Sequence, residues 1–460
     1  MKKEDLAEAL TGVSEKYVTE SSPSRRSRRR GVIAAIAACL VLALSLGAVL
    51  SFVLPRSSAA VRPSRSLKRH AAVFAEYPKT PSGNAYYTYL AQLRDTDYGA
   101  GRDLMGFYKK TSAVFLGSGS NEFCSPLDIY LALAMTAEAA DGETRAEILE
   151  LLEVGSIDEL RVKTGKLYRS VYRNNQAEGA CIPSASLWLN DGTLYDADTL
   201  ETLKSRYHAS VFCGQMGDKS YDALMNKWIR EMTDGLVGDV SPTTSQDRAR
   251  IITTLYFDAK WEESFTLEKG TRTFRSPGGD REINFMSGSG NAFYLGNGFK
   301  AASKKLADGS SVWFVLPDEE ITLSDLISSG EALDAILGGE GEMGWDVTIV
   351  APKLDISSET SLIEGLKKLG VTKCFSETEA DFSNLSGDDP LFIDEAAHSV
   401  RYVLDEERVR AASFTLFGFM PKAAQPMPVE LVADRPFMIV HVSEDLTPLF
   451  IGAVYDPAAN

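Results

Sequence analysis

The stretch at positions 404–437 reads LDEERVRAASFTLFGFMPKAAQPMPVELVADRPF and indicates an exposed connection between two strands. An acidic strand end at 405–407 leads into small residues at 411–413, and prolines then punctuate 421–428. The apolar run 438–442 follows directly. Connections longer than about 12–15 residues are uncommon unless they are functional or disordered, so this stretch predicts a functional loop. Its small, weakly structured residues could also pair with a sheet.

The charge of the chain is divided unevenly between a basic N-terminus and an acidic body. Residues 1–70 hold 13 Lys and Arg against 5 Asp and Glu, a net charge of +8, and the remaining 390 residues carry a net charge of −24. Nucleic-acid binding depends on clustered Lys and Arg, so the acidic body argues against a nucleic-acid partner. The acidity serves solubility and would also suit encounter with a basic protein. An apolar content of 44% is enough for a large buried core.

The N-terminal region predicts a membrane anchor. Residues 31–54, GVIAAIAACLVLALSLGAVLSFVL, are uncharged, and about 20 apolar residues suffice for a helix to cross a bilayer. Arginines stand just before this run, which places the N-terminus in the cytoplasm. We therefore expect a single-pass protein of the cell membrane, with a cytoplasmic tail at 1–30, a transmembrane helix at 31–54, an extracellular stalk at 55–86 and an extracellular domain at 87–457. A cleaved signal peptide is the alternative, although this run is longer than a typical signal h-region.

The body of the chain predicts an α+β fold with helices early and strands late. Residues 125–135 are apolar on almost every side, as in a buried helix. Thr144 is expected to cap a second helix, with Glu147 completing a capping box. The runs 251–257 and 312–316 are short and rich in apolar, β-branched or aromatic residues, as in strands buried on both faces.

The chain shows little sign of a metal site, a cofactor site or a catalytic centre. Cys124, Cys181, Cys213 and Cys374 are widely scattered without a zinc-binding spacing, so we expect free thiols rather than a metal site. The chain contains no GxSxG, HExxH or Walker motif. An enzyme, such as an anchored hydrolase, is therefore disfavoured, and no cofactor is expected.

Short motifs occur in a fixed order along positions 87–457. They include Ser125-Pro126, Gly142-x-Thr144, Asn226-x-Trp228, Tyr256-Phe257 with Lys260-Trp261, Phe285-Met286, Leu316-Pro317, Ala351-Pro352-Lys353, Leu369-Gly370, Ala380-Asp381-Phe382, Asp434-Arg435-Pro436-Phe437 and Phe450-Ile451-Gly452. Each motif is weak alone, but their order over a whole domain resembles that of the serpin family. On this resemblance the chain is identified as a bacterial, membrane-anchored serpin. The fold so implied has a large central β-sheet, further sheets, about nine helices and an exposed reactive-centre loop.

The resemblance implies a protease inhibitor that acts as a suicide substrate, and not an enzyme. In that mechanism the target protease cleaves the loop and becomes acyl-linked to it, and it is trapped when the loop inserts as a new strand into the large sheet. The partner would be a serine protease, with a cysteine protease as the alternative, and the inhibitor would be a monomer. A non-inhibitory serpin, acting as a cell-surface binding or carrier domain, is the second possibility.

The resemblance also predicts the reactive bond, by counting from both sides of the loop. In the family, the hinge glutamate is the seventeenth residue back when the residue before the cleaved bond is counted as the first. If Glu406 is this glutamate, the residue before the cleaved bond is Lys422 and the residue after it is Ala423. Counting fifteen positions back from Phe437 reaches the same Lys422, whereas the shorter spacing of some family members points to Gln425. An exposed lysine at this position suits trypsin-like proteases, whose specificity pocket is acidic.

The hinge that leads into the loop departs from the family pattern. It comprises Glu406, Glu407, Arg408, Val409, Arg410, Ala411, Ala412, Ser413, Phe414 and Thr415. Successive side chains of a strand face opposite sides, so the small or medium, uncharged residues at 409, 411, 413 and 415 would share the buried face of an inserted strand. The bulky residues would face solvent. Arg408 replaces a usual glycine, which removes backbone freedom and could slow insertion.

A second group of residues resembles the hydrogen-bonded cluster that controls opening of the sheet in the family. Ser125 and His398 match that cluster, whereas Asp128 stands where a second serine is common and Thr253 where an asparagine is common. Asp128 beside His398 could form a charged pair and alter stability, although a buried histidine more often has only a structural role.

Overall fold

The computed structural model describes residues 99–175, 179–339, 345–387, 390–409 and 427–458, and scattered positions between 71 and 97. The transmembrane helix expected at 31–54, most of the stalk and positions 410–426 of the loop lie outside the described residues. Within the described part, no helix is both long enough and apolar enough to cross a membrane.

One of two six-stranded sheets has the strand order β1-β5-β4-β6-β15, with β3 paired to β4. These strands are β1 (Ala71–Val73), β3 (Arg173–Asn175), β4 (Gly179–Asn190), β5 (Ala209–Gly214), β6 (Ala249–Lys260) and β15 (Arg408–Val409). β4 and β6 pair antiparallel along nearly their whole length. The short β15 pairs only with Lys260 and Ala259, at the end of β6. Among the described residues, most of one edge of β6 therefore has no strand partner.

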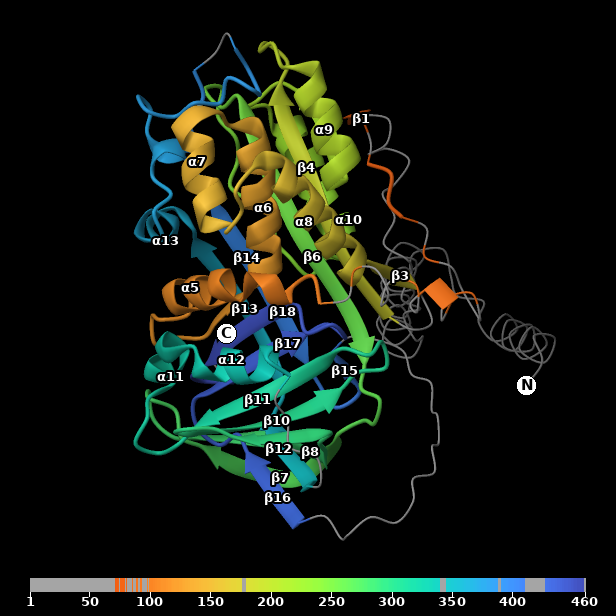
Figure 1. The fold of residues 1–460 in the computed structure, drawn as a ribbon. Coiled ribbons are helices and arrows are strands. Elements are labelled where there is room, and N and C mark those ends of the chain that lie inside the picture. Colours follow the sequence, from red (N-terminus) through yellow and green to blue (C-terminus); the bar gives the residue numbers. More distant parts are fainter. Residues whose placement is uncertain are drawn as a thin grey trace, which may run out of the picture. The chain divides into compact units, whose positions relative to one another are not determined.

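A separate two-stranded ladder lies beside this sheet (Figure 1). β13 (Leu354–Ser361) and β14 (Ala397–Leu404) pair antiparallel from one end to the other. Over the described ranges, β14 has no second strand partner, and no ladder joins β14 to β6. The large central sheet expected from the sequence is therefore present in two parts, separated between β6 and β14.

Two further sheets complete the β structure of the described residues. Their strand orders are β2-β18-β17-β11-β10-β9 and β16-β12-β8-β7. The first contains β2 (Glu122–Cys124), β9 (Ala292–Leu295), β10 (Phe299–Lys305), β11 (Ser311–Pro317), β17 (Phe437–Val442) and β18 (Pro448–Val454). The second contains β7 (Thr266–Phe274), β8 (Arg281–Ser289), β12 (Trp345–Pro352) and β16 (Met427–Val432). β16 follows the loop and pairs in parallel with β12, so the two ends of the loop are held on different sheets.

Nine α-helices lie within the described residues, in agreement with the expected number. They are α5 (Met105–Phe115), α6 (Pro126–Ala139), α7 (Gly142–Leu151), α8 (Ile157–Val171), α9 (Ala197–Tyr207), α10 (Lys219–Met232), α11 (Leu323–Ser329), α12 (Glu331–Leu337) and α13 (Ile363–Lys368). Two short 3₁₀ helices, η1 (Arg102–Leu104) and η2 (Lys373–Phe375), accompany them. The buried helix predicted at 125–135 is α6. Ser125 caps it by accepting a hydrogen bond from the Asp128 amide at 3.2 Å.

The start of α7 differs from the sequence-based expectation. Asp141, rather than Thr144, is its N-cap residue, and no side chain makes a capping hydrogen bond there. The buried Thr144 hydroxyl instead accepts a hydrogen bond from the Asp381 amide at 3.0 Å. The Glu147 carboxylate accepts one from the Lys373 amide at 2.8 Å. Both side chains tie α7 to segments far away in the sequence, and local spacing could not reveal these contacts.

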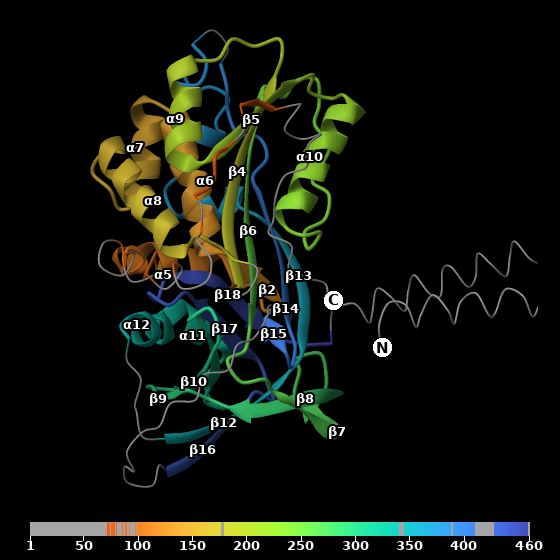
Figure 2. The ribbon, with the colours of Figure 1, turned by 90° about the vertical axis from the view of Figure 1, so that its right-hand side faces the viewer.

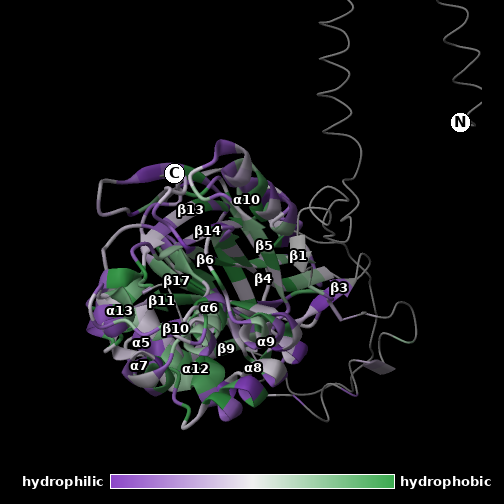
Figure 3. Cartoon of the chain, turned by 90° about the horizontal axis from the view of Figure 1, so that it is seen from above, coloured by the Kyte–Doolittle hydropathy of each residue, from purple (hydrophilic) through white to green (hydrophobic). Residues whose placement is uncertain are grey.

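Helices cover both faces of strands β4 and β6. Figure 2 shows α6, α7, α8 and α9 on one side of these strands and α10 on the other. Along β6, Leu255 and Phe257 pack in the main core with α6, whereas Ile252 packs on the cluster that contains Trp228 of α10. Alternate residues of β6 therefore face opposite layers, as strand geometry requires. Seen from above, hydrophobic residues gather on these central strands (Figure 3).

Candidate functional site: a slot between strands β6 and β14

A cavity of about 550 Å³ lies between β6 and β14. Ile251 and Leu255 of β6 and Val400 of β14 line it, and Ile129 of α6 lines it from the core side. Unpaired strand edges expose backbone N–H and C=O groups that can pair with an added strand. Within the described residues both strand edges that border the cavity lack such a partner. The cavity, called the slot below, therefore has the chemistry of a vacant strand position, with a hinge end beside Lys260 and a far end beside Ala249.

The four residues predicted to control opening of the sheet meet at this slot. The Ser125 amide donates a hydrogen bond to His398 Nε2 at 2.9 Å, and Asp128 Oδ2 lies 3.7 Å from His398 Nδ1. Thr253 of β6 also lines the slot, and its interaction with the Asp128 side chain acts to lower the pKa of that carboxyl group. Asp128 of α6 therefore reaches both strands that border the slot. Its Oδ1 atom is buried at the slot and accepts no hydrogen bond from any of the described residues.

Burial favours the neutral forms of Asp128 and His398. Desolvation raises the pKa of Asp128 to about 7, and the interaction with Thr253 acts in the opposite direction. Desolvation lowers the pKa of His398 to about 4. Because Nε2 accepts from the Ser125 amide, the proton of the neutral imidazole is on Nδ1, which faces Asp128. The charged pair considered from the sequence is therefore disfavoured, since both side chains are shielded from water.

The hinge begins with a tight turn built by Asp405. Its Oδ1 atom accepts hydrogen bonds from the Glu407 and Arg408 amides at 2.8 and 2.9 Å. Its own amide donates to the Arg408 carbonyl oxygen at 3.0 Å. Trp261 Nε1 donates to the Asp405 carbonyl oxygen at 2.9 Å. An aspartate that bonds to the backbone ahead of it is typical of turns. This turn reverses the chain after β14 and returns it to the edge of β6.

Further contacts hold the hinge in place at the hinge end of the slot. Glu406 forms an ion pair with Lys353 at 2.5 Å, and the hydrogen bond in this pair lowers the pKa of the Glu406 carboxyl group. Val409 pairs opposite Ala259 and is only 4% exposed. Val409 therefore faces the core, and its neighbour Arg408, which is partly buried, faces the opposite side.

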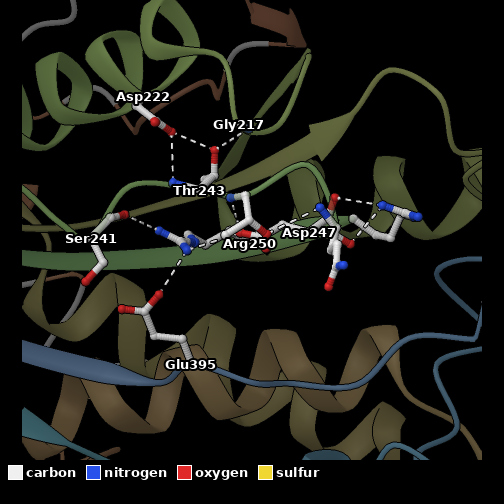
Figure 4. A network of polar contacts seen from close by, with 10 residues as sticks. Gly217, Asp222, Ser241, Thr243, Asp247, Arg250 and Glu395 are labelled. Atoms are coloured by element: carbon white, nitrogen blue, oxygen red, sulfur yellow. Dashed lines mark hydrogen bonds and ion pairs between the residues drawn. The ribbon is translucent and has the colours of Figure 1, made fainter.

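A network of polar contacts lies at the far end of the slot (Figure 4). Arg250 Nη2 of β6 lies 2.9 Å from Glu395 Oε2, in the segment before β14, and 3.3 Å from Asp247 Oδ2. Arg250 Nη1 donates to the Ser241 carbonyl oxygen at 2.7 Å. No sequence pattern identified these residues, because Arg250 and Glu395 are 145 positions apart and neither stands in a motif.

Most of the loop residues with predicted roles lie outside the described residues. These are Arg410, Ala411, Ala412, Ser413, Phe414, Thr415, Lys422 and Ala423, together with the alternative Gln425. The structure describes where the loop starts, at β15, and where it returns, at β16. The described cysteines are unpaired thiols. No group of side chains in the described part has the composition of a metal site.

Known sequences match this chain over most of its length. The profile of the family described as "Serpin (serine protease inhibitor)" matches residues 105–457. "Putative serpin-Z12" from Oryza sativa subsp. japonica is 28% identical over 386 residues, which cover 76% of this chain and 89% of that protein. "Alpha-1-antiproteinase S" from Cavia porcellus is 28% identical over 356 residues, which cover 74% of this chain and 85% of that protein.

Solved structures share the fold. The native state of tengpin, a thermophilic serpin, matches with a TM-score of 0.68 at 23% identity, over 85% of this chain and 99% of that chain. Human thyroxine-binding globulin matches with a TM-score of 0.66 at 21% identity, over 80% of this chain and 100% of that chain. The profile covers well over half of the sequence, from α5 to just beyond β18. The chain therefore belongs to the serpin family.

Proposed function

We propose that the protein inhibits a trypsin-like serine protease as a suicide substrate. The protease would cleave the bond between Lys422 and Ala423, and the carbonyl carbon of Lys422 would stay linked to the protease while the freed loop inserts between β6 and β14. The slot carries this proposal, because its strand edges lack partners in the described part and its hinge end already holds β15. Membership of the family and a relative named as an antiproteinase support protease inhibition in general.

The register of β15 supports insertion with a defined alternation of side chains. Arg408 opposite Lys260 and Val409 opposite Ala259 begin an antiparallel ladder along the open edge of β6. A strand that continued this ladder would place positions 411, 413 and 415 on the same face as Val409, toward the core. The residues at these positions are Ala, Ser and Thr. They are small and uncharged, so this face can be buried without the cost of desolvating a charge.

Mixing the protein with trypsin should give a complex that survives denaturing electrophoresis, because the acyl bond is covalent. Loop-cleaved protein should also unfold at a higher temperature than intact protein, since the inserted strand gives hydrogen-bond partners to both open edges. Calorimetry of the intact and cleaved forms measures this difference. Cleavage with neither a stable complex nor a change in unfolding temperature would instead favour a binding or carrier function.

Lys422→Ala should abolish complex formation with trypsin, because the acidic specificity pocket loses the cation that it recognises. The free energy of unfolding should change by no more than about 0.5 kcal/mol, as for a substitution in an exposed loop. Complex formation on gels and unfolding in urea measure the two effects. Trapping that persists in this variant would move the reactive bond to Gln425 or a nearby residue.

Ala411→Glu separates cleavage from insertion in the same assay. The new carboxylate would lie on the buried face of the inserted strand, where an unpaired charge is costly. This variant should still be cleaved after Lys422, but it should release the protease as an ordinary substrate does. Ala412→Glu is the matched control, because its side chain would lie on the opposite face. Equal trapping by the two variants would contradict the proposed alternation.

We also propose that Asp128 makes opening of the slot depend on pH. Asp128 lies beside Thr253 and His398, one on each strand, and its Oδ1 atom accepts no hydrogen bond from the residues that the structure describes. Ionisation of a buried carboxyl group in this position destabilises the intact form. Its pKa of about 7, against an ordinary value of 3.8, puts that ionisation near neutral pH. An ionised Asp128 would therefore destabilise the closed arrangement of β6 and β14 and favour opening of the slot.

Asp128→Asn should stabilise the intact protein most at and above pH 7, and progressively less as the pH falls toward 4. Below pH 3.8, Asp128 is protonated in both the folded and the unfolded parent, so it does not lower the free energy of unfolding. Because its pKa is raised in the folded state, the free energy of unfolding decreases as the pH rises toward 7. Asparagine stays neutral and keeps an acceptor for the His398 Nδ1 proton. Urea unfolding of parent and variant between pH 4 and pH 8 measures the difference, and a difference that is constant with pH would contradict the proposal.

A membrane location is proposed from the N-terminal sequence. Residues 31–54 are uncharged and long enough to span a bilayer, and the arginines before them favour a cytoplasmic N-terminus. Protease added to intact cells should therefore digest the large domain and spare a tag placed before Met1. Protection of the large domain would contradict this topology, and release of the whole domain into the medium would favour a cleaved signal peptide.

A further inference from the structure

The slot is bridged at its hinge end, at its middle and at its far end. At the hinge end, the turn at Asp405 carries the chain from β14 to β6. At the middle, Asp128 reaches both strands. At the far end, Arg250 of β6 meets Glu395 across the slot at 2.9 Å. The first two bridges involve the hinge and the sheet-opening cluster, whereas the third belongs to neither.

Arg250 is held in position from its own side of the slot. Its Nη1 atom donates to the Ser241 carbonyl oxygen, and its Nη2 atom lies 3.3 Å from Asp247 Oδ2. The Arg250 side chain is only 17% exposed, whereas that of Glu395 is 41% exposed. The guanidinium group is therefore preorganised before it meets Glu395. Loss of the Glu395 contact would leave Arg250 with its other two partners.

The same network continues from Arg250 to the helix that covers the sheet. Ser241 lies in the connection between α10 and β6, two residues before Thr243. The Thr243 amide and hydroxyl donate to Asp222 Oδ1 of α10 at 3.1 and 2.6 Å. Figure 4 shows these contacts from Asp222 through the connection to Arg250 and on to Glu395. The contact across the slot therefore joins the segment before β14 to an assembly that includes both β6 and α10.

Arg250 stands on the path that an inserting strand would follow. The ladder of β15 begins opposite Lys260 and runs antiparallel along β6, so a strand that continued it would reach Arg250 ten residues later. Because the Arg250 and Glu395 side chains meet across the slot, a strand cannot pass between them until the pair opens. A partly exposed ion pair is weak, so its effect on such an opening is about two- to fivefold.

We propose that the ion pair between Arg250 and Glu395 is a clasp that holds the far end of the slot closed and slows the last stage of strand insertion. This inference rests on the proposed function, and it adds a residue pair that regulates it. The clasp protects the intact protein against spontaneous insertion of the uncleaved loop. It also delays insertion after cleavage, which gives the bound protease more time to hydrolyse the acyl bond and escape.

Hydrogen exchange of the intact protein tests the clasp without any protease. Glu395→Gln removes the charge and keeps the shape of the side chain. It should speed exchange of backbone amides at 249–252 and 397–399 about two- to fivefold. Arg250→Gln should do at least as much, and the double variant should exchange no faster than Arg250→Gln alone, because both substitutions remove one interaction. Asp394→Asn, which neutralises the exposed neighbouring carboxylate, is the control and should leave exchange unchanged.

Counting loop cleavages per trapped trypsin tests the effect on insertion. Glu395→Gln should lower this ratio, because faster insertion leaves less time for release, whereas Asp394→Asn should not change it. Exchange that is unaltered in Glu395→Gln, or additive in the double variant, would overturn the clasp. Faster exchange with an unchanged cleavage ratio would overturn its role in insertion. A parent protein that is cleaved without trapping trypsin would refute the proposed function and, with it, the clasp's role in insertion. The exchange experiment would still decide whether the clasp exists.

Discussion

In the described part of the chain, the long edges of β6 and β14 that face the slot have no strand partner, and the elements around them are arranged about this open position. In an ordinary sheet, backbone N–H and C=O groups at interior edges pair with a neighbouring strand. Here two long edges border a cavity of about 550 Å³ instead, within the part of the chain that the structure describes. In the intact form, the backbone N–H and C=O groups along these edges therefore remain available for pairing with another strand. A strand placed in the slot would complete the central sheet.

The surrounding elements position the slot and also limit access to it. On the core side, α6 presents Asp128 and Ile129 toward it, and on the other face α10 covers β4 and β6. The turn at Asp405 directs only two residues, Arg408 and Val409, into pairing with β6. The two ends of the loop are held on different sheets, at β15 and at β16. The loop must therefore be cut, or one of its ends must detach, before a long strand can insert.

The residues that bridge the slot differ in how they resist opening. Asp128 is buried, and desolvation keeps it largely neutral below about pH 7. Its effect therefore depends on protonation. The ion pair between Arg250 and Glu395 is partly exposed, so salt and side-chain entropy limit its strength. Neither interaction is large compared with the hydrogen bonds that a full strand would form. Interactions of this strength can change the rate of strand insertion without preventing it.

Residue patterns along the chain were enough to predict the family, the α+β class and the main elements, because these depend on local patterns and on the order of short motifs. The helix at 125–135 and the strand at 312–316 were predictable, since their hydrophobic patterns specify burial. The strand at 251–257 is also present, but the expected burial on both faces holds only in part, because positions 251, 252, 253 and 255 are partly exposed. The sequence also predicted that Ser125, Asp128, Thr253 and His398 form one cluster, but only through the family resemblance. Spacing alone misplaced the cap of α7, because Thr144 bonds to a segment far away in the chain.

Three features became visible only in three dimensions: the separation of β6 from β14, the contact between Arg250 and Glu395, and the burial that favours a neutral Asp128 beside His398. Strand pairing, ion pairing and desolvation depend on how segments more than a hundred residues apart are placed against one another. Hydrophobic periodicity encodes which face of an element is buried, but it does not encode which neighbour that face or edge will meet.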